Sequence, residues 1–353
     1  MGIEQDLLRV SFTLVRFAAF AANGLLFGAV PLLLFVLRPA LRLLDARSWR
    51  PGRMELAVRL EGLLRAALVA SAVATVLALL LQTALVSLLD EGDLGLDALE
   101  AVLSTSFGIW SLIRLPVLGA LSVLLYQRVQ DLCLSGMAPS ERNPGRAWWT
   151  LWGLLSLTLL ATWSFAGHAA VSNPAWAALT NDVVHLAAGA AWFAGIVILA
   201  VILPDVWQSK GRPDRLRILS AVVSRFSRLA LIAIVVVAIT GTINSFFNLE
   251  SPGDLVDSGY GIMLTIKIAL FLGIFVLGAV NHFLVRRRLQ NAVNESSSSD
   301  PYALFRKTIA TELVLGLLIL GATGLLVGLA RTRESGTQSA PALNFEWERD
   351  RSF

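Results

Sequence analysis

The chain has 353 residues, of which 56% are hydrophobic and only 15% are charged. Soluble proteins usually carry about 25% charged residues, and a soluble chain of this length could not remove so much apolar surface from water. The composition therefore predicts an integral membrane protein, and the formal net charge of +4 is read as a signal of membrane orientation, not of nucleic-acid binding.

Apolar segments long enough to cross a bilayer recur along the whole chain. A hydrocarbon core of about 30 Å requires about 20 apolar residues per helix, and the backbone polar groups must be satisfied within each helix. The predicted spans are about 11–37, 62–88, 107–127, 147–168, 179–203, 222–247, 260–285 and 304–330. A helical extension is expected over 54–61 and a short interfacial helix over 94–102. The fold predicted is an all-α membrane protein of eight spans in contact with the lipid bilayer.

The connections between these spans alternate in charge. The 38–59 connection carries six arginines, whereas the 89–106 connection carries five acidic residues and neither lysine nor arginine. The same alternation continues to the last connection. The positive-inside rule therefore places the basic connections in the cytoplasm and both termini outside, as in a protein of the bacterial cytoplasmic (inner) membrane with periplasmic ends.

Two pairs of short segments indicate an internal repeat. Phe107–Arg114 aligns without gaps to Tyr260–Lys267, and Arg65–Ala70 is similar to Arg228–Ala233. Chance similarity of apolar sequence is the alternative, but a basic residue stands at the same place in both copies. Two halves of four spans share one orientation, as in a parallel repeat about the membrane normal. The predicted boundaries are 1–168 and 169–332 for the two halves and 333–353 for a flexible external tail.

Three residues near the outer ends of spans four and five are candidate metal ligands. His168 closes span four, and His185 lies about two turns into span five, three residues after Asp182. Residues three apart share a helix face, and imidazole and carboxylate groups suit copper or zinc. Alternatively, Asp182 fixes a histidine tautomer without touching the metal. A reading without metal also stays open, with His168 capping a helix end and His185 bonded to Asp182.

Other polar residues lie inside the spans, where such groups are costly and usually functional. Lys267 and Glu312 enter from opposite sides and are expected to approach each other near the middle of the membrane. With Arg114 and Asn281 they form either a network joining the two halves or the lining of an ion or proton path. His282, at the cytoplasmic end of span seven, is interpreted as interfacial. Tryptophans near span ends are expected to be interfacial anchors, namely Trp148, Trp149, Trp163 and Trp176.

Several motifs are absent from the sequence. There is no phosphate-binding loop, no stretch long enough for a nucleotide domain, and no Cys-x-x-Cys-His haem attachment. The single cysteine, Cys133, excludes an internal disulfide and a paired-cysteine metal site. We therefore expect no nucleotide or nucleic-acid partner, no ATP-driven pumping and no enzymatic activity.

The second half resembles the CopD family of bacterial copper-resistance and copper-uptake membrane proteins. The stretches that carry the resemblance are Arg225–Ala230, Thr240–Asn244, Tyr260–Gly261 with Lys267, Gly278–Asn281 and Glu312–Gly316, preceded by Gly167–Ala170, Asp182–His185, Trp192 and Gly195. The first half resembles the family in span count and in Leu26–Gly28. The resemblance implies copper handling in the cytoplasmic membrane, and it favours copper as the ion at His168, His185 and Asp182. It also implies a CopC-like periplasmic copper-binding partner, which we expect to be a separate protein.

The function predicted is import of copper ions, Cu⁺ or Cu²⁺, from periplasm to cytoplasm without ATP. A membrane potential of 100 mV, inside negative, supplies about 2.3 kcal/mol per monovalent cation. One alternative is a redox protein in which His168 and His185 are the axial ligands of a b-type haem. Another is a non-transporting membrane partner of a periplasmic copper chaperone.

Overall fold

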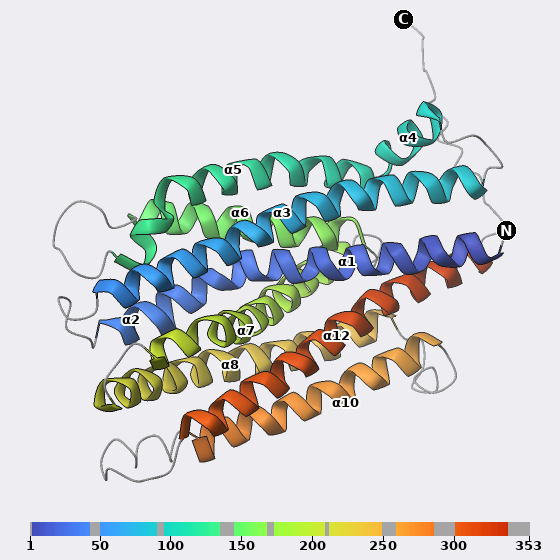
Figure 1. Cartoon of the computed structure of the whole chain (residues 1–353). Coiled ribbons are helices and arrows are strands. Elements are labelled where there is room, and N and C mark those ends of the chain that lie inside the picture. Colours follow the sequence, from blue (N-terminus) through green and yellow to red (C-terminus); the bar gives the residue numbers. More distant parts are fainter. Residues whose placement is uncertain are drawn as a thin grey trace, which may run out of the picture.

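The computed structural model describes residues 2–42, 50–89, 95–134, 145–167, 173–208, 212–248, 259–285 and 301–337. Within these ranges the protein is helical and contains no strand (Figure 1). The long helices are α1 (Gly2–Pro31), α3 (Arg50–Leu89), α5 (Ser106–Leu134), α6 (Arg146–Phe165), α7 (Ala175–Gln208), α8 (Arg212–Asn248), α10 (Gly259–Val280) and α12 (Pro301–Thr337). Each predicted span lies largely on one of them, so the prediction of an all-α fold is confirmed.

Shorter elements adjoin the long helices. The π-helical segment η1 (Leu32–Leu37) and α2 (Arg38–Leu41) extend α1, and η3 (Asn281–Val285) extends α10. Because Pro31 has no backbone N–H, it removes one hydrogen bond of α1 just before η1 begins. The helix expected over 94–102 is confirmed as α4 (Leu96–Leu103), and the extension expected over 54–61 is part of α3.

Six helical stretches in the described part of the chain are long and apolar enough to cross a membrane. They are Leu7–Leu41, Glu55–Leu88, Ser106–Tyr126, Ala175–Val201, Leu216–Phe247 and Gly261–Val280. Large apolar side chains such as Leu14, Leu80 and Phe275 point outward from the bundle, as lipid-facing residues do. The protein is therefore a multi-pass membrane protein by the length and composition of its helices, whereas crossings by α6 and α12 and the outer location of the termini stay predictions.

Helix α1 lies in the middle of the bundle, between α3 and α7 (Figure 1). Gly24 and Gly28 face α7, where a Cβ on Gly28 would overlap the carbonyl oxygen of Ala190 and the side chain of Ala194. Small residues spaced by four let two helix backbones approach closely in a membrane. The sequence of α1 thus sets the contact that joins the two predicted halves.

The neighbours of each helix follow a similar order in the two predicted halves. Helix α1 packs on α3 as α7 packs on α8, and α5 packs on α6 as α10 packs on α12. The difference is that α3 packs closely along α5, whereas α8 and α10 touch only slightly. Space is left between α8 and α10, and the cavity described below is lined by both helices. The boundary at residue 168 stays a prediction.

The tryptophans expected at the interface occupy different environments. Trp176 is 74% exposed, but Trp149 and Trp163 are only 8% and 5% exposed. The prediction of an interfacial anchor is therefore wrong for Trp149 and Trp163, because α6 turns these side chains into the bundle. Trp163 packs against Phe20 of α1, with ring centroids 4.8 Å apart.

Candidate functional site

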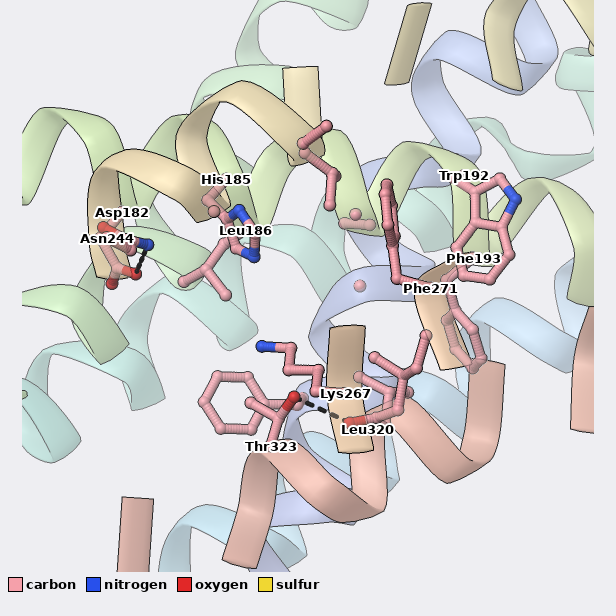
Figure 2. Close-up of a pocket in the computed structure, with 18 of the residues that line it drawn as sticks. Asp182, His185, Leu186, Trp192, Phe193, Asn244, Lys267, Phe271, Leu320 and Thr323 are labelled. Atoms are coloured by element: carbon pink, nitrogen blue, oxygen red, sulfur yellow. Dashed lines mark hydrogen bonds between the residues drawn. The ribbon is translucent and has the colours of Figure 1, made fainter. Parts of the chain in front are cut away.

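A cavity of about 550 Å³ lies among α1, α6, α7, α8, α10 and α12. One end is polar and includes Asp182 and Asn244, and the other end is walled by Trp192, Phe193 and Phe271 (Figure 2). From Asp182 to Phe193 the cavity follows about 16 Å of α7, at 1.5 Å per residue. It therefore runs from near the start of α7, the predicted outer end, towards the middle of the bundle.

One face of α7 forms a long wall of this cavity. Asp182, His185, Gly189 and Trp192 all line it, and they are spaced by three or four residues. This spacing places side chains on one side of a helix. The common face predicted for Asp182 and His185 is thus present, and it is turned towards the cavity.

The ring of His185 is held by helix α8. Its Nδ1 lies 2.9 Å from Oγ1 of Thr240, and the Thr240 hydroxyl donates to the carbonyl oxygen of Val236 at 2.6 Å. Because a hydroxyl has one proton, the Thr240 oxygen accepts from Nδ1–H of His185. This tautomer leaves Nε2 with its lone pair available to a metal ion. Gly241 makes room for the ring, since a Cβ there would lie 3.3 Å from Cε1 of His185.

Asp182 belongs to a row of polar contacts between α7 and α8. Asn244 donates from Nδ2 to Oδ1 of Asp182 at 3.4 Å. Asn181 in turn donates to Oδ1 of Asn244 at 2.6 Å and to the backbone oxygen of Thr240 at 2.9 Å. In the described part of the chain the ring of His185 is therefore bonded to Thr240, not to Asp182, while the Asp182 carboxylate accepts from Asn244 and lines the cavity.

Lys267 reaches into the same cavity from α10 (Figure 2). Its positive charge is close enough to interact with both Asp182 and His185. A cation bound at His185 would be repelled by Lys267 and attracted by Asp182. The site is therefore an imidazole and a carboxylate with an ammonium group opposite them.

His168 falls outside the described residues. Gly167, the residue before it, lines the cavity. Over the ranges that the structure describes, no three or more histidine, cysteine, aspartate or glutamate side chains gather as a metal-binding group. The predicted set of His168, His185 and Asp182 therefore stays a prediction. The side chain of His282 is also outside the described part.

Glu312 and Asn281 form a second polar pair, apart from the cavity lining. Their side chains are buried, and Nδ2 of Asn281 donates to Oε1 of Glu312 at 2.6 Å. Asn281 lies about 21 Å along its helix from Lys267, at 1.5 Å per residue. Lys267 and Glu312, which were expected to approach each other, are thus at different levels of the bundle.

The indole of Trp192 packs on helix α12 at the apolar end of the cavity. A Cβ on Gly316 would lie 3.2 Å from Cη2 of Trp192, so the ring rests directly on the glycine. Gly316 is four residues after Glu312 and on the same helix face. The lining of the apolar end therefore includes Trp192 and Gly316 and does not include Asn281 or Glu312.

Arg114 links helices α5 and α6. The guanidinium is fully buried, donates to Oγ1 and to the backbone oxygen of Thr162 at 2.8 and 3.1 Å, and donates to Ser111 at 3.2 Å. It also lies 3.8 Å from the centroid of the Trp163 ring. The charged group of Arg114 is therefore engaged in contacts between helices. In the aligned position of the other half, Lys267 instead faces the cavity.

Sequence reasoning missed the role of Thr240. Thr240 and Asn244 are four residues apart and share a face of α8, which was a usable signal. Nothing in the sequence, however, pairs that face with Asp182 and His185 on another helix.

The fold and the cavity define a multi-pass helical membrane protein with an imidazole–carboxylate site inside the bundle. A family model described as Copper resistance protein D matches residues 220–326, and one described as Copper resistance protein D-like, N-terminal domain, matches residues 7–178. Together they cover most of the chain. The protein belongs to the copper resistance protein D family, which confirms the resemblance and associates it with copper.

Two relatives have names that refer to copper. The chain is 30% identical to "Copper transport protein CutJ" of Bacillus subtilis (strain 168) over 173 residues, which is 49% of this chain and 29% of that protein. It is 28% identical to "Copper resistance protein D" of Pseudomonas syringae pv. tomato over 193 residues, which is 52% of this chain and 59% of that protein. The match therefore spans less than two thirds of either relative. No solved structure matches the chain.

Proposed function

We propose that this protein carries copper ions across the cytoplasmic membrane into the cytoplasm, and that the cavity is where the ion is first held. The observation that carries the proposal is the placement of Asp182 and His185 on one cavity wall. His185 presents Nε2 as a free ligand atom because Thr240 occupies Nδ1.

The copper ion is the cargo, and His168 is proposed as its third ligand. Imidazole nitrogen suits copper, and a carboxylate oxygen adds a ligand for Cu²⁺ or neutralises charge for Cu⁺. Gly167 on the cavity wall supports this proposal, because His168 is the next residue. Asp182 also offsets the charge of Lys267.

The driving force proposed is the membrane potential together with the copper gradient. Acidic residues in the 89–106 and 248–259 connections would raise the local cation concentration at the outer surface. About 2.3 kcal/mol per 100 mV is available to a monovalent cation moving inward. We propose that inward passage moves the ring of Trp192 away from Gly316, against which it packs at the apolar end of the cavity.

The proposed setting is the bacterial inner membrane, with both termini outside and a separate CopC-like protein delivering copper. The family descriptions name copper and not haem, so no observation favours the axial-ligand alternative.

Copper uptake into proteoliposomes tests the proposal. His185→Ala and Asp182→Asn should reduce the initial rate by about tenfold or more, because each removes a ligand atom or its charge. Leu186→Ala is the matched control, since it shortens another side chain of the same cavity without removing a ligand atom. If the wild type bound copper and yet took it up no faster than empty vesicles leak, that result would contradict transport and favour a non-transporting copper partner.

A further inference from the structure

The pair formed by Asn281 and Glu312 is enclosed on all sides. Their relative exposures are 6% and 3%, and the Nδ2–Oε1 distance is 2.6 Å. Asn281 is also the first residue of the π-helical segment η3. Short π-helical segments inside α-helices are frequently found at functional sites.

One atom of this pair lacks a partner. Oδ1 of Asn281 is buried and accepts no hydrogen bond from the described residues. An unsatisfied buried polar group costs about 1–3 kcal/mol. An ionised carboxylate can only accept hydrogen bonds, whereas a carboxylic acid has one O–H donor. In its acid form Glu312 would donate from Oε2 to Oδ1 of Asn281 while Oε1 accepts from Nδ2. One proton on Glu312 therefore allows two hydrogen bonds between the carboxylic acid and the amide, which together form a ring.

The charged residues around the pair also favour the acid form of Glu312. The titratable side chains that the structure describes on α12 and on the elements packed near the pair are Tyr302, Arg306, Lys307, Lys267, Arg217, Arg225, Arg228, Asp182, His185, Arg9 and Arg16, and His282 is next to Asn281 in the chain. In the part of the chain that the structure describes, none of them forms an ion pair with Glu312; the side chain of His282 lies outside that part. Arg306 and Lys307 are exposed, and Lys267 is about 21 Å away along α10 and η3. An isolated ionised carboxylate in such surroundings is strongly disfavoured.

We propose that Glu312 holds a proton in this conformation and that the Asn281–Glu312 pair is the proton-carrying site of the transport cycle. When the cargo cation passes the level of Trp192, the carboxylic acid of Glu312 releases one proton to cytoplasmic water and becomes a carboxylate. After the cation has left, the carboxylate takes up a proton from the water of the cavity, which restores the acid. For Cu⁺ the incoming charge replaces the proton that leaves, so the buried net charge is unchanged; for Cu²⁺ it rises by one. This coupling rests on the proposed copper transport, but the protonation of Glu312 does not.

Infrared difference spectroscopy on copper-free purified protein tests the proton directly. Glu312→Gln should remove a carboxylic-acid carbonyl band that shifts in heavy water. The matched control is Glu61→Gln, because Glu61 is ion-paired with Arg65 and should contribute only a carboxylate band. A spectrum in which Glu312→Gln removes a carboxylate band instead would overturn the proposal.

The folding of the same variant is a second test. Glutamine reproduces the acid's donor and acceptor, so Glu312→Gln should fold with a thermal midpoint close to that of the wild type. Glu312→Ala should lower the midpoint, since it leaves Asn281 without a partner. A Glu312→Gln protein that does not fold would mean that the negative charge is needed, contrary to the proposal.

The coupling of copper movement to proton movement is measured in proteoliposomes that contain a pH indicator. Inward copper flux should be accompanied by proton release on the cytoplasmic side of the membrane in the wild type, and Glu312→Gln should abolish this release. Copper flux without proton movement in the wild type would overturn the coupling. If instead copper flux were absent altogether, the transport proposal would fail, and the infrared band would still decide whether Glu312 is protonated.

Discussion

At the scale of single residues, the hydroxyl of Thr240 determines which nitrogen of His185 is free. Its proton goes to the backbone of Val236 and its oxygen accepts from Nδ1. The free Nε2 therefore does not depend on Asp182. The carboxylate can then serve as a ligand or as the counter-charge to Lys267.

Replacing Thr240 by valine should weaken copper binding by about 10- to 100-fold, the usual effect of losing a group that orients a metal-binding histidine. Thr240→Ser keeps the hydroxyl and is the control, with affinity expected near that of the wild type. Competition with a copper chelator of known affinity measures both. Equal affinities for the valine and serine variants would show that this hydrogen bond does not prepare the ligand.

Arg114 is expected to contribute to stability and not to copper binding. Arg114→Lys loses the planar group that bonds Thr162 and stacks on Trp163, and lysine does not replace arginine at such sites. We predict a loss of about 2 kcal/mol in unfolding free energy, within the range for disrupted buried networks. Thermal unfolding measures the loss, and copper bound per folded molecule should not change. A stable variant that binds no copper would instead assign Arg114 to the ion path.

At the scale of the helices, the contact of α1 with α7 depends on Gly28. Gly28→Ala should destabilise the protein by about 1–3 kcal/mol, as overpacking does, because the added methyl group meets the backbone of α7. Gly153→Ala is the matched control, since nothing lies within 4 Å of a Cβ there. Tryptophan fluorescence during heating of the purified protein compares the two variants. Equal midpoints would show that the two helices are not closely packed at Gly28.

The helices themselves were largely predictable, because apolar length and turn-forming connections are local properties of the sequence. Which helices become neighbours was not. The Asp182–His185 face followed from a spacing of three, but its partners Thr240 and Asn244 lie on α8. Trp163 shows the same limit, since its place near a span end did not reveal that α6 faces inward there.

At the scale of the whole molecule, Asp182 and Asn244 line one end of the cavity and Trp192 lines the other. The charged connections predict that the polar end faces the outside. In a Cys133→Ser background, Ser245→Cys on the cavity wall should react with a membrane-impermeant thiol reagent added outside intact cells. Thr308→Cys, buried one turn before Glu312, is the control and should not react. Labelling of Ser245→Cys only in inside-out vesicles would reverse the orientation inferred from the charged connections.

The aligned basic residues of the two predicted halves lie in different surroundings. Arg114 is enclosed where α3 packs along α5, whereas Lys267 faces open space where α8 and α10 separate. The alignment of these residues was visible in the sequence. The different packing around them was not, because it arises from helix contacts distant in the chain.

The measurement that bears most directly on copper in the cavity is X-ray absorption spectroscopy of the copper-loaded, purified protein. The wild type should show imidazole nitrogen scattering that is reduced in His185→Ala, with no sulfur ligand. A spectrum dominated by sulfur, or one left unchanged by His185→Ala, would place the ion elsewhere and contradict the account.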